Sequence, residues 1–473
     1  MYKLPLAIYI LLLHFWNAPL CAQGVPPELA AAFQQTLQNQ RNTLGVKSLS
    51  AAVQFNNDSI WNGAYGISST FPLDSVTPDY AYAIGSITKS ITAACILQLA
   101  DEGLLHLDDS VSKWLPPFPY VNPNITIRQL LRHQSGLYDV ITNPAYDAAT
   151  KVNLDSIWTL SNLVQDYINP PLFQPGTSWS YSNTNYALLG LIIEAVTGES
   201  YRTEFTNRFF GPLQLPSLLL PPFDPNPADI AHLWVYNPAN NTSADAHGFY
   251  SQWHSFRSSA GPIGGYYGTA RDIAVWNRAF LRGDLHSVDI MNEAKTTVAT
   301  TMPNSGRYGL GIMERKFWGL TGYGHGGDIG YSGITYYFPA KDISITVLNN
   351  DAKKNSWALA PVIQALLKNY LDYEASVSTA SPWAFTELNP QVYPNPFTDE
   401  VSVSLYLPNG VQDAGYQITD ALGKSISNGT LGSFASGDQT FIIPTGTTWP
   451  SGVYFLSLQL DGTGTRAVRL VKM

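Results

Sequence analysis

Helical and strand-like hydrophobic patterns alternate along the chain from residue 26 to about residue 372. Apolar positions at helical spacing predict one helix over residues 86–102 and another over residues 184–197. A glycine follows each of these segments, and glycine favours the end of a helix. A third helix is predicted over residues 356–371, where the alternation ends.

Two short apolar segments, residues 332–338 and 343–348, predict neighbouring strands. The four residues between them include a proline and an aspartate, which is typical of a turn. We therefore assign residues 26–375 to one domain of mixed helices and strands.

The pattern changes after residue 375. Residues 376–390 are polar, contain two prolines and have no periodicity, so we interpret them as a linker. Apolar and polar residues alternate over residues 391–473, which is typical of strands with one buried face. Turn residues separate these runs, and the pattern predicts a small antiparallel β-sandwich. The alternating apolar positions are Val401, Val403, Leu405 and Leu407 in one run, and Tyr454, Leu456, Leu458 and Leu460 in another.

Composition narrows the possible functions. Of the 473 residues, 45% are hydrophobic and 12% are aromatic, which excludes a disordered chain. The net charge is −9 and no basic block is present, so no nucleic-acid partner is expected. The two cysteines, Cys21 and Cys95, are too few for a four-cysteine zinc site or a disulfide framework. No cofactor is expected.

Residues 1–22 have the pattern of a secretory signal peptide. Lys3 precedes an apolar run over residues 4–16, and cleavage is expected after Ala22. The run is shorter than the ~20 residues that a membrane-spanning helix needs, and no other segment is long and apolar enough, so no transmembrane segment is expected. A lipid-modified Cys21 is the alternative, although Leu20 is a poor fit before such a cysteine.

The first candidate for chemistry is Ser86, followed by Lys89 three residues later. Residues at this spacing lie on one face of a helix, so the Lys89 amine can reach the Ser86 hydroxyl. A serine becomes a good nucleophile when a neighbouring base takes its proton. A lysine can act as that base when burial lowers its pKa. The start of a helix also favours negative charge, and the Ser86 N–H could form half of an oxyanion hole.

The Ser-x-x-Lys spacing is not specific by itself. Ser110 and Lys113 repeat it where no apolar helix follows, and we interpret that copy as a capped surface turn. A structural role is also the alternative for Ser86, which would then cap the helix beside a solvated lysine.

The second candidate is the pair Tyr181 and Asn183, directly before the predicted helix at 184–197. The phenol could relay a proton, and the amide could hydrogen-bond Lys89 or a substrate carbonyl. The same Tyr-x-Asn spacing also occurs at residues 120–122, 167–169 and 393–395.

The third candidate is His325, which lies between Gly324 and the pair Gly326 and Gly327. Glycines allow a backbone to approach a ligand closely. A histidine beside them could steer a substrate carboxylate or polarise the phenol. The alternative is a glycine-rich turn that carries an exposed histidine.

Together, in this order, the three motifs resemble those of serine-reactive β-lactamases and penicillin-binding proteins. Tyrosine in the second motif and His-Gly-Gly in the third resemble the class C branch. That branch includes class C β-lactamases, D-alanyl-D-alanine carboxypeptidases, D-aminopeptidases and β-lactamase-like esterases. The flanking segments 125–137, 173–176 and 324–332 strengthen the resemblance, which covers residues 45–350.

The resemblance implies a β-lactamase-like fold of mixed α/β (α+β) class, with an antiparallel sheet flanked by helices and an all-helical subdomain. The active site would lie between these two parts. Ser86 would be the acylated nucleophile, Lys89 its general base or co-base, and Tyr181 the group that shuttles the proton. The backbone N–H groups of Ser86 and Asp328 would form the oxyanion hole. The residues implied in substrate binding are Asn183, His325, Gly326, Gly327 and Asp328.

The chain departs from the family pattern at His325, where the family often has lysine. A histidine with its ordinary pKa of ~6.5 is mostly neutral at pH 7. It would therefore capture a substrate carboxylate less well than lysine. We expect an ester, a D-amino-acid amide or a peptide substrate rather than a β-lactam, and we expect His325 to change the rate as the pH falls toward 6.

Segments 393–397, 420–424 and 451–454 resemble the C-terminal sorting domain of the type IX secretion system of Bacteroidetes. This resemblance implies passage across the outer membrane, with the secretion machinery as partner. Removal of the domain and release or surface attachment would follow. An accessory carbohydrate-binding sandwich is the alternative.

The leading prediction is a secreted serine hydrolase that acts through an acyl-enzyme on a small-molecule or peptide substrate. The alternative is a catalytically silent receptor or binding protein on the same scaffold. A metallohydrolase that uses Asp245, His247 and His254 is less well supported, because no His-Glu-x-x-His motif is present. The Gly-x-Ser-x-Gly motif of α/β-hydrolases is absent from the sequence.

Overall fold

The computed structural model describes most of the chain in two compact units, Met1–Asn369 and Tyr370–Met473. The predicted signal peptide, and the 381–390 part of the predicted linker, lie outside the described residues. No helix within the described residues is long and apolar enough to cross a membrane. The described residues are 24–227, 229–302, 306–380, 391–398, 400–407, 410–420, 424–445, 449–460, 463–464 and 468–472.

A nine-stranded antiparallel sheet forms the centre of the first unit, in the order β3-β2-β1-β13-β12-β11-β10-β9-β8. Every residue of β1, β12 and β13 is buried, as expected for central strands that are covered on both faces. The predicted strand pair is confirmed, and each strand is one residue longer than predicted. The strands are β1 Ser48–Gln54, β2 Ile60–Thr70, β3 Leu73–Ser75, β8 Val298–Ala299, β9 Arg307–Tyr308, β10 Met313–Phe317, β11 Leu320–Ile329, β12 Tyr331–Phe338 and β13 Ile343–Asn349.

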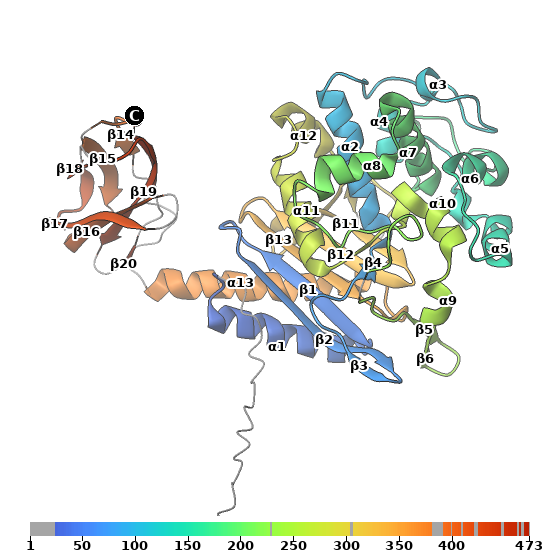
Figure 1. The fold of residues 1–473 in the computed structure, drawn as a ribbon, viewed down its shortest axis with the longest axis horizontal. Coiled ribbons are helices and arrows are strands. Elements are labelled where there is room, and N and C mark those ends of the chain that lie inside the picture. Colours follow the sequence, from blue (N-terminus) through green and yellow to red (C-terminus); the bar gives the residue numbers. More distant parts are fainter. Residues whose placement is uncertain are drawn as a thin grey trace, which may run out of the picture. The chain divides into compact units, whose positions relative to one another are not determined.

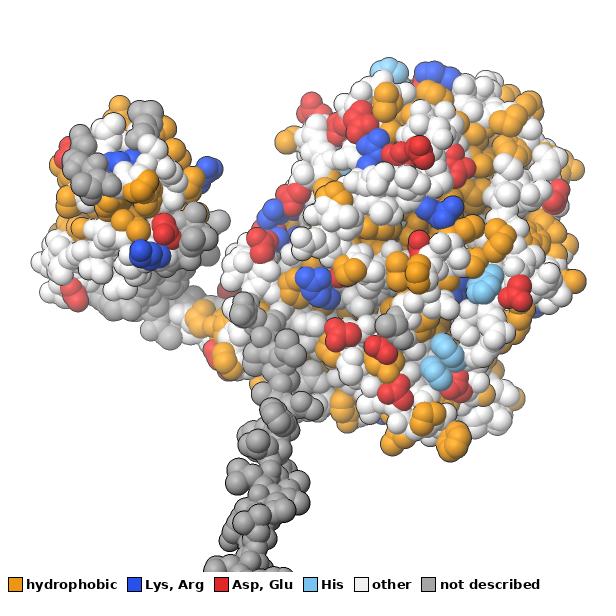
Figure 2. Space-filling view, viewed as in Figure 1, with side chains coloured by type: hydrophobic (Ala, Val, Ile, Leu, Met, Phe, Trp, Pro, Cys, Tyr) orange, Lys and Arg blue, Asp and Glu red, His pale blue; other side chains and the backbone are white. Residues whose placement is uncertain are grey.

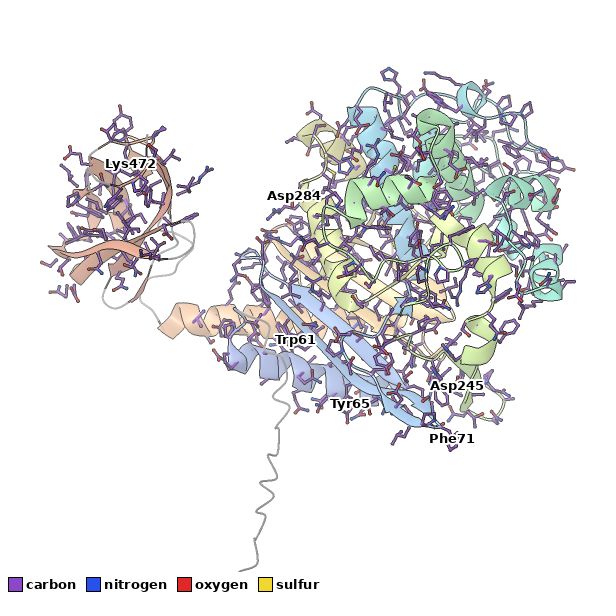
Figure 3. The ribbon with its side chains drawn as sticks, in the orientation of Figure 1. Trp61, Tyr65, Phe71, Asp245, Asp284 and Lys472 are labelled. Atoms are coloured by element: carbon purple, nitrogen blue, oxygen red, sulfur yellow. The ribbon has the colours of Figure 1, made fainter. Side chains whose placement is uncertain are left out.

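The first and last helices of this unit, α1 (Pro27–Leu44) and the start of α13 (Ala360–Ala380), lie side by side on one side of the sheet (Figure 1). Phe33 of α1 packs on Trp61 of β2, with ring centroids 5.0 Å apart, and Figure 3 labels Trp61 on that strand. The predicted closing helix begins as a 3₁₀ turn and continues to Ala380. It therefore extends past residue 376, where the linker was predicted to begin.

Helices dominate the chain between β3 and β8, and they lie on the other side of the sheet (Figure 1). Helix α2 (Thr88–Asp101) is buried around most of its circumference and packs against α7 (Asn183–Thr197) and α10 (His254–Gly264). Both predicted helices are therefore confirmed. The other helices here are α3 Val111–Trp114, α4 Ile127–Leu131, α5 Pro144–Val152, α6 Leu160–Tyr167, α8 Tyr201–Phe205, α9 His247–Tyr250, α11 Ala270–Arg282 and α12 Val288–Ala294.

Two short strand pairs complete the first unit. β4 (Tyr82–Ala83) pairs with the distant β7 (Tyr267–Gly268), and β5 (Trp234–Asn237) forms a hairpin with β6 (Thr242–Asp245). On the visible face of the molecule, acidic, basic and apolar side chains are interspersed (Figure 2).

The second unit contains two small antiparallel sheets, as the alternating pattern predicts. The alternating apolar positions of β15 and β19 are buried in one shared core. The first sheet contains β14 Gln391–Tyr393, β15 Glu400–Leu407 and β18 Gly437–Pro444. The second contains β16 Val411–Asp420, β17 Ser425–Phe434, β19 Gly452–Leu460, β20 Thr463–Gly464 and β21 Val468–Lys472.

Candidate active site

Ser86 and Lys89 lie where a 3₁₀ turn, Gly85–Ile87, leads into α2. Lys89 Nζ lies 2.9 Å from Ser86 Oγ, so the two side chains meet as the spacing predicts. Gly85 has a φ of 51°, and a Cβ at this position would lie 2.9 Å from the backbone nitrogen of Asp328. Glycine therefore allows the serine turn to lie directly against β11.

The Lys89 amine is fully buried and lies within hydrogen-bond distance of three oxygens. Besides Ser86 Oγ, these are Asn183 Oδ1 at 2.7 Å and the carbonyl of Ile263 at 2.8 Å. Burial lowers the pKa of Lys89 to about 7. A neutral amine has two N–H groups, which can donate to Asn183 and Ile263, and one lone pair, which then faces the Ser86 hydroxyl. This arrangement suits a base that removes the serine proton.

Tyr181 lies beside this pair, with its ring centroid 5.1 Å from Lys89 Nζ and 4.2 Å from the ring of His133. Burial raises the pKa of Tyr181 well above 10, although a hydrogen bond with Ser86 acts in the opposite direction. The phenol therefore keeps its proton at neutral pH, which suits a proton donor better than a base.

Asn183 is the first residue of α7, and its amide connects Lys89 to the half-buried carboxylate of Asp139. Its Nδ2 donates to Asp139 Oδ2 at 2.9 Å. Asp139 is not among the site residues that the sequence predicts. It lies two residues beyond the flanking segment 125–137, and no spacing rule connects it to the three motifs.

His325 is placed differently from expectation. Its side chain is fully buried, and the cavity beside Ser86 is lined without it. The Tyr308 hydroxyl lies 2.9 Å from its Nε2, and its Nδ1 lies 2.6 Å from the Gly326 carbonyl. Burial, together with the charge of Lys89, lowers the pKa of His325 to about 3. The expectation that His325 titrates near pH 6 is therefore wrong, because a buried imidazole is costly to charge.

Gly326, Gly327 and Asp328 follow on β11 and run past the serine. A Cβ on Gly327 would lie 2.0 Å from the Ile84 carbonyl and 2.9 Å from the Ser86 nitrogen, so only glycine permits this approach. The Asp328 carboxylate accepts hydrogen bonds from the backbone nitrogen of Ser356, at 2.7 Å, and from its hydroxyl, at 2.6 Å. The backbone of the expected oxyanion hole is thus brought together.

A cavity of about 330 Å³ opens at these residues. Five of the predicted site residues line it, together with a mostly apolar wall that the sequence does not predict. Its lining consists of Ser86, Tyr181, Asn183, Gly326, Asp328, Met302, Met313, Ser356 and Trp357.

The second Ser-x-x-Lys copy, Ser110 and Lys113, does not line this cavity. Lys113 forms an ion pair with Asp109, with Nζ 2.8 Å from each carboxylate oxygen, and Ser110 Oγ lies 3.1 Å from Ser112 Oγ. The interpretation as a capped surface turn is wrong about the cap, because the Ser110 side chain makes no capping hydrogen bond to the short helix Val111–Trp114 that follows it.

The histidines considered for a metallohydrolase do not form a metal site within the part of the chain that the structure describes. His247 stacks on His232, with ring centroids 4.0 Å apart, and His232 Nδ1 lies 2.7 Å from Asp245 Oδ2. His254 instead faces Asp155, and its Nδ1 lies 3.4 Å from Asp155 Oδ1. Asp245 lies at the end of β6 (Figure 3).

Residues 33–367 match the β-lactamase family. This chain belongs to that family. The resemblance drawn from the three motifs is thereby confirmed, as is the β-lactamase-like fold. Residues 391–472 match the family described as the secretion system C-terminal sorting domain, which confirms the second resemblance and indicates export to the cell surface or the medium.

Two bacterial relatives match part of this chain. Protein flp of Staphylococcus aureus (strain MW2) is 39% identical over 159 residues, which are 33% of this chain and 31% of that protein. Penicillin-binding protein 4* of Bacillus subtilis (strain 168) is 33% identical over 189 residues, which are 37% of this chain and 39% of that protein. The matches thus span only about a third of the relatives' length.

Solved structures match over longer stretches. The D-stereospecific amidohydrolase from Streptomyces sp. is 32% identical and has a TM-score of 0.60, and the match covers 71% of this chain and 98% of that chain. The D-amino acid amidase from Ochrobactrum anthropi SV3 has a TM-score of 0.64 over 73% of this chain and 99% of that chain. At 22% identity, the second likeness shows the fold alone.

Proposed function

We propose that this protein is a secreted serine hydrolase that cleaves an ester, amide or D-amino-acid peptide bond through an acyl-enzyme at Ser86. One observation carries the proposal. The buried Lys89 amine has two neutral oxygen acceptors, on Asn183 and Ile263, and its third contact is the hydroxyl that must lose a proton. A base with a pKa of about 7 is partly unprotonated at neutral pH, where it can act.

The reaction follows from this geometry. Ser86 Oγ adds to the substrate carbonyl carbon while its proton passes to Lys89 Nζ. The backbone N–H groups of Ser86 and Asp328 stabilise the oxyanion. The Tyr181 phenol donates its proton to the leaving amine or alkoxide and regains one from Lys89. Water then attacks the acyl-enzyme through the same groups in reverse, which frees the acid and restores the Ser86 hydroxyl.

The charge of the cavity wall favours certain substrates. Among the described lining residues, none is lysine or arginine, and Asp328 is the only carboxylate. A substrate with a carboxylate beside the scissile bond would find no cation on this wall. A neutral ester or an amide with a free amino group would not meet that penalty. The D-stereospecific amidohydrolase named above supports an amide substrate.

Active-site labelling tests this proposal directly. The purified mature protein is incubated with a fluorophosphonate and, separately, with a penicillin, and the mass shift is located by peptide mapping. We expect a fluorophosphonate adduct on Ser86 and none in Ser86→Ala. Ser110→Ala is the matched control, because it removes the serine of the other Ser-x-x-Lys copy, and it should label like the wild type.

The same experiment separates the hydrolase from a silent binding protein. Failure of the folded wild type to label or to hydrolyse a p-nitrophenyl ester or a D-alanyl anilide would favour the silent receptor. Labelling that persists in Ser86→Ala would place the nucleophile elsewhere.

The sorting domain supports a proposal about the route of export. We propose that the secretion machinery recognises residues 391–473 and removes them after passage across the outer membrane. The test is to express the chain with and without these residues in a host that has this machinery. The shortened chain should stay in the periplasm, and its arrival in the medium would contradict the proposal.

A further inference from the structure

A chain of hydrogen bonds leads from the candidate nucleophile to a carboxylate outside the cavity. Ser86 Oγ, Lys89 Nζ, the Asn183 amide and the Asp139 carboxylate follow one another at 2.9, 2.7 and 2.9 Å. Asp139 is not among the residues that line the cavity, so it can act on the reaction only through its neighbours.

We propose that Asp139 is a positioning residue, which orients the Asn183 amide and through it holds the Lys89 amine toward Ser86. The inference rests on the function proposed above. An ionised carboxylate can only accept hydrogen bonds, so Asp139 requires the NH₂ end of the amide to face it. The carbonyl end of Asn183 must then face Lys89, where it takes up one of the amine's hydrogens.

The protein holds Asp139 firmly at this position. Asp139 Oδ1 accepts a hydrogen bond from the backbone nitrogen of Ile141 at 3.2 Å, and so caps the 3₁₀ turn Val140–Thr142. Thr184, the second residue of α7, forms hydrogen bonds with the residues directly before and after Asp139. Its hydroxyl donates to the Tyr138 carbonyl at 2.6 Å and lies 3.1 Å from the Val140 nitrogen. The carboxylate and Asn183 are therefore fixed to the same end of α7 before any substrate binds.

The half-buried carboxylate of Asp139 also acts on Lys89 through its charge, although partial burial raises the pKa of Asp139 itself. Burial lowers the pKa of Lys89, whereas the charge of Asp139 raises it. The phenols that face Lys89 stay protonated because burial raises their pKa values, and the imidazoles stay neutral because burial lowers theirs. Asp139 is thus the group facing Lys89 that can supply a negative charge. The other titratable groups facing Lys89 are the phenols of Tyr181 and Tyr186, at 5.1 and 5.5 Å from the ring centroids, and the imidazoles of His133 and His325.

The pH dependence of Ser86 acylation distinguishes this role from a purely structural one. The rate of fluorophosphonate labelling, measured by mass spectrometry, and kcat/KM for a p-nitrophenyl ester are followed as functions of pH. Asp139→Asn keeps the shape of the side chain but removes its charge. In this variant, we expect the part of the pH profile where the rate rises with pH to shift to lower pH by about one unit. The reason is that the Lys89 ammonium loses the negative charge that stabilises it, so the pKa of Lys89 falls. The plateau should fall about tenfold, because Asn183 is no longer forced into one orientation.

Two further variants keep the result interpretable. Asp139→Ser retains an oxygen that can cap the 3₁₀ turn but is too short to reach Asn183, so it should show the same shift in a folded protein. Asp166→Asn is the matched control, because Asp166 is an exposed acid on α6, and its profile should equal that of the wild type. Thermal unfolding verifies that each variant is folded.

The outcomes separate this inference from the proposed function. An unchanged acidic limb in folded Asp139→Asn or Asp139→Ser, with labelling still on Ser86, overturns the role of Asp139 alone. A wild type that is not labelled on Ser86 overturns the proposed function. A shift in both Asp139 variants, and none in Asp166→Asn, supports the inference.

Discussion

Ser86 and Lys89 share their three-residue spacing with Ser110 and Lys113, but the two pairs lie in opposite surroundings. The Lys89 side chain is fully buried, and its hydrogen-bond acceptors are neutral oxygens. The Lys113 side chain is 49% exposed and forms an ion pair with Asp109. Burial without a direct ion pair lowers the pKa of Lys89, so its ammonium loses a proton more easily. The spacing brings an amine to a hydroxyl, and the surroundings decide whether that amine is a base.

The largest expected effect comes from removing the Lys89 amine, with removal of the Lys113 amine as the comparison. Lys89→Met keeps most of the buried volume but removes the base, so kcat/KM for a p-nitrophenyl ester should fall by at least about a thousandfold. Lys113→Met is the matched control and should change the rate less than about twofold, because Lys113 forms a surface ion pair with Asp109. Steady-state kinetics on both folded variants measure the contrast. Comparable losses in the two variants would show that burial does not distinguish the copies.

The sequence predicts the contacts that depend on local spacing. Ser86 meets Lys89 because three residues make about one turn, and α7 ends directly before Gly198, which has a φ of 75°. The strand pair β12 and β13 is also predicted to within one residue at each end, because both segments are short, apolar and separated by a turn.

Contacts that depend on tertiary packing could not be predicted in this way. Asp139 lies 44 residues before its partner Asn183, and no periodicity connects them. The buried His325 contacts Tyr308, which comes from a different strand of the sheet. The end of α13 was missed for another reason. Residues 372–380 have no apolar period, yet they continue the helix that the preceding apolar residues begin.

A smaller effect is expected from Tyr181, and it depends on the leaving group. In Tyr181→Phe, hydrolysis of a D-alanyl anilide should fall about a hundredfold, because the leaving amine needs a proton that the phenol donates. Hydrolysis of a p-nitrophenyl ester should fall only a few-fold, because p-nitrophenolate leaves without a proton. Parallel kcat/KM values for the two substrates measure the difference. An equal loss on both substrates would mean that Tyr181 acts in the attack by Ser86 rather than in proton return.

Tyr167→Phe is a suitable control for this substitution. Tyr167 belongs to another of the Tyr-x-Asn matches, and its ring stacks on Trp158, with centroids 5.5 Å apart, away from Lys89. Both substrates should be hydrolysed at wild-type rates by this variant. The comparison between two tyrosines then parallels the comparison between the two lysines.

The smallest expected effect is the pH dependence, which identifies the group that titrates. Lys89 has a pKa lowered to about 7 and acts as a base in its neutral form, so kcat/KM should rise as the pH increases through about 7 and then level off. Below the midpoint, the rate should fall about tenfold per pH unit as the amine is protonated.

His325, with a pKa of about 3, is neutral throughout this range. His325→Gln should therefore leave the midpoint unchanged, even if the plateau is lower because the Tyr308 contact is altered. If the midpoint of the pH profile moved as far in His325→Gln as in Asp139→Asn, the imidazole would be charged in the native protein. Burial would then not keep the groups of this site neutral, which contradicts the contrast drawn between buried Lys89 and exposed Lys113.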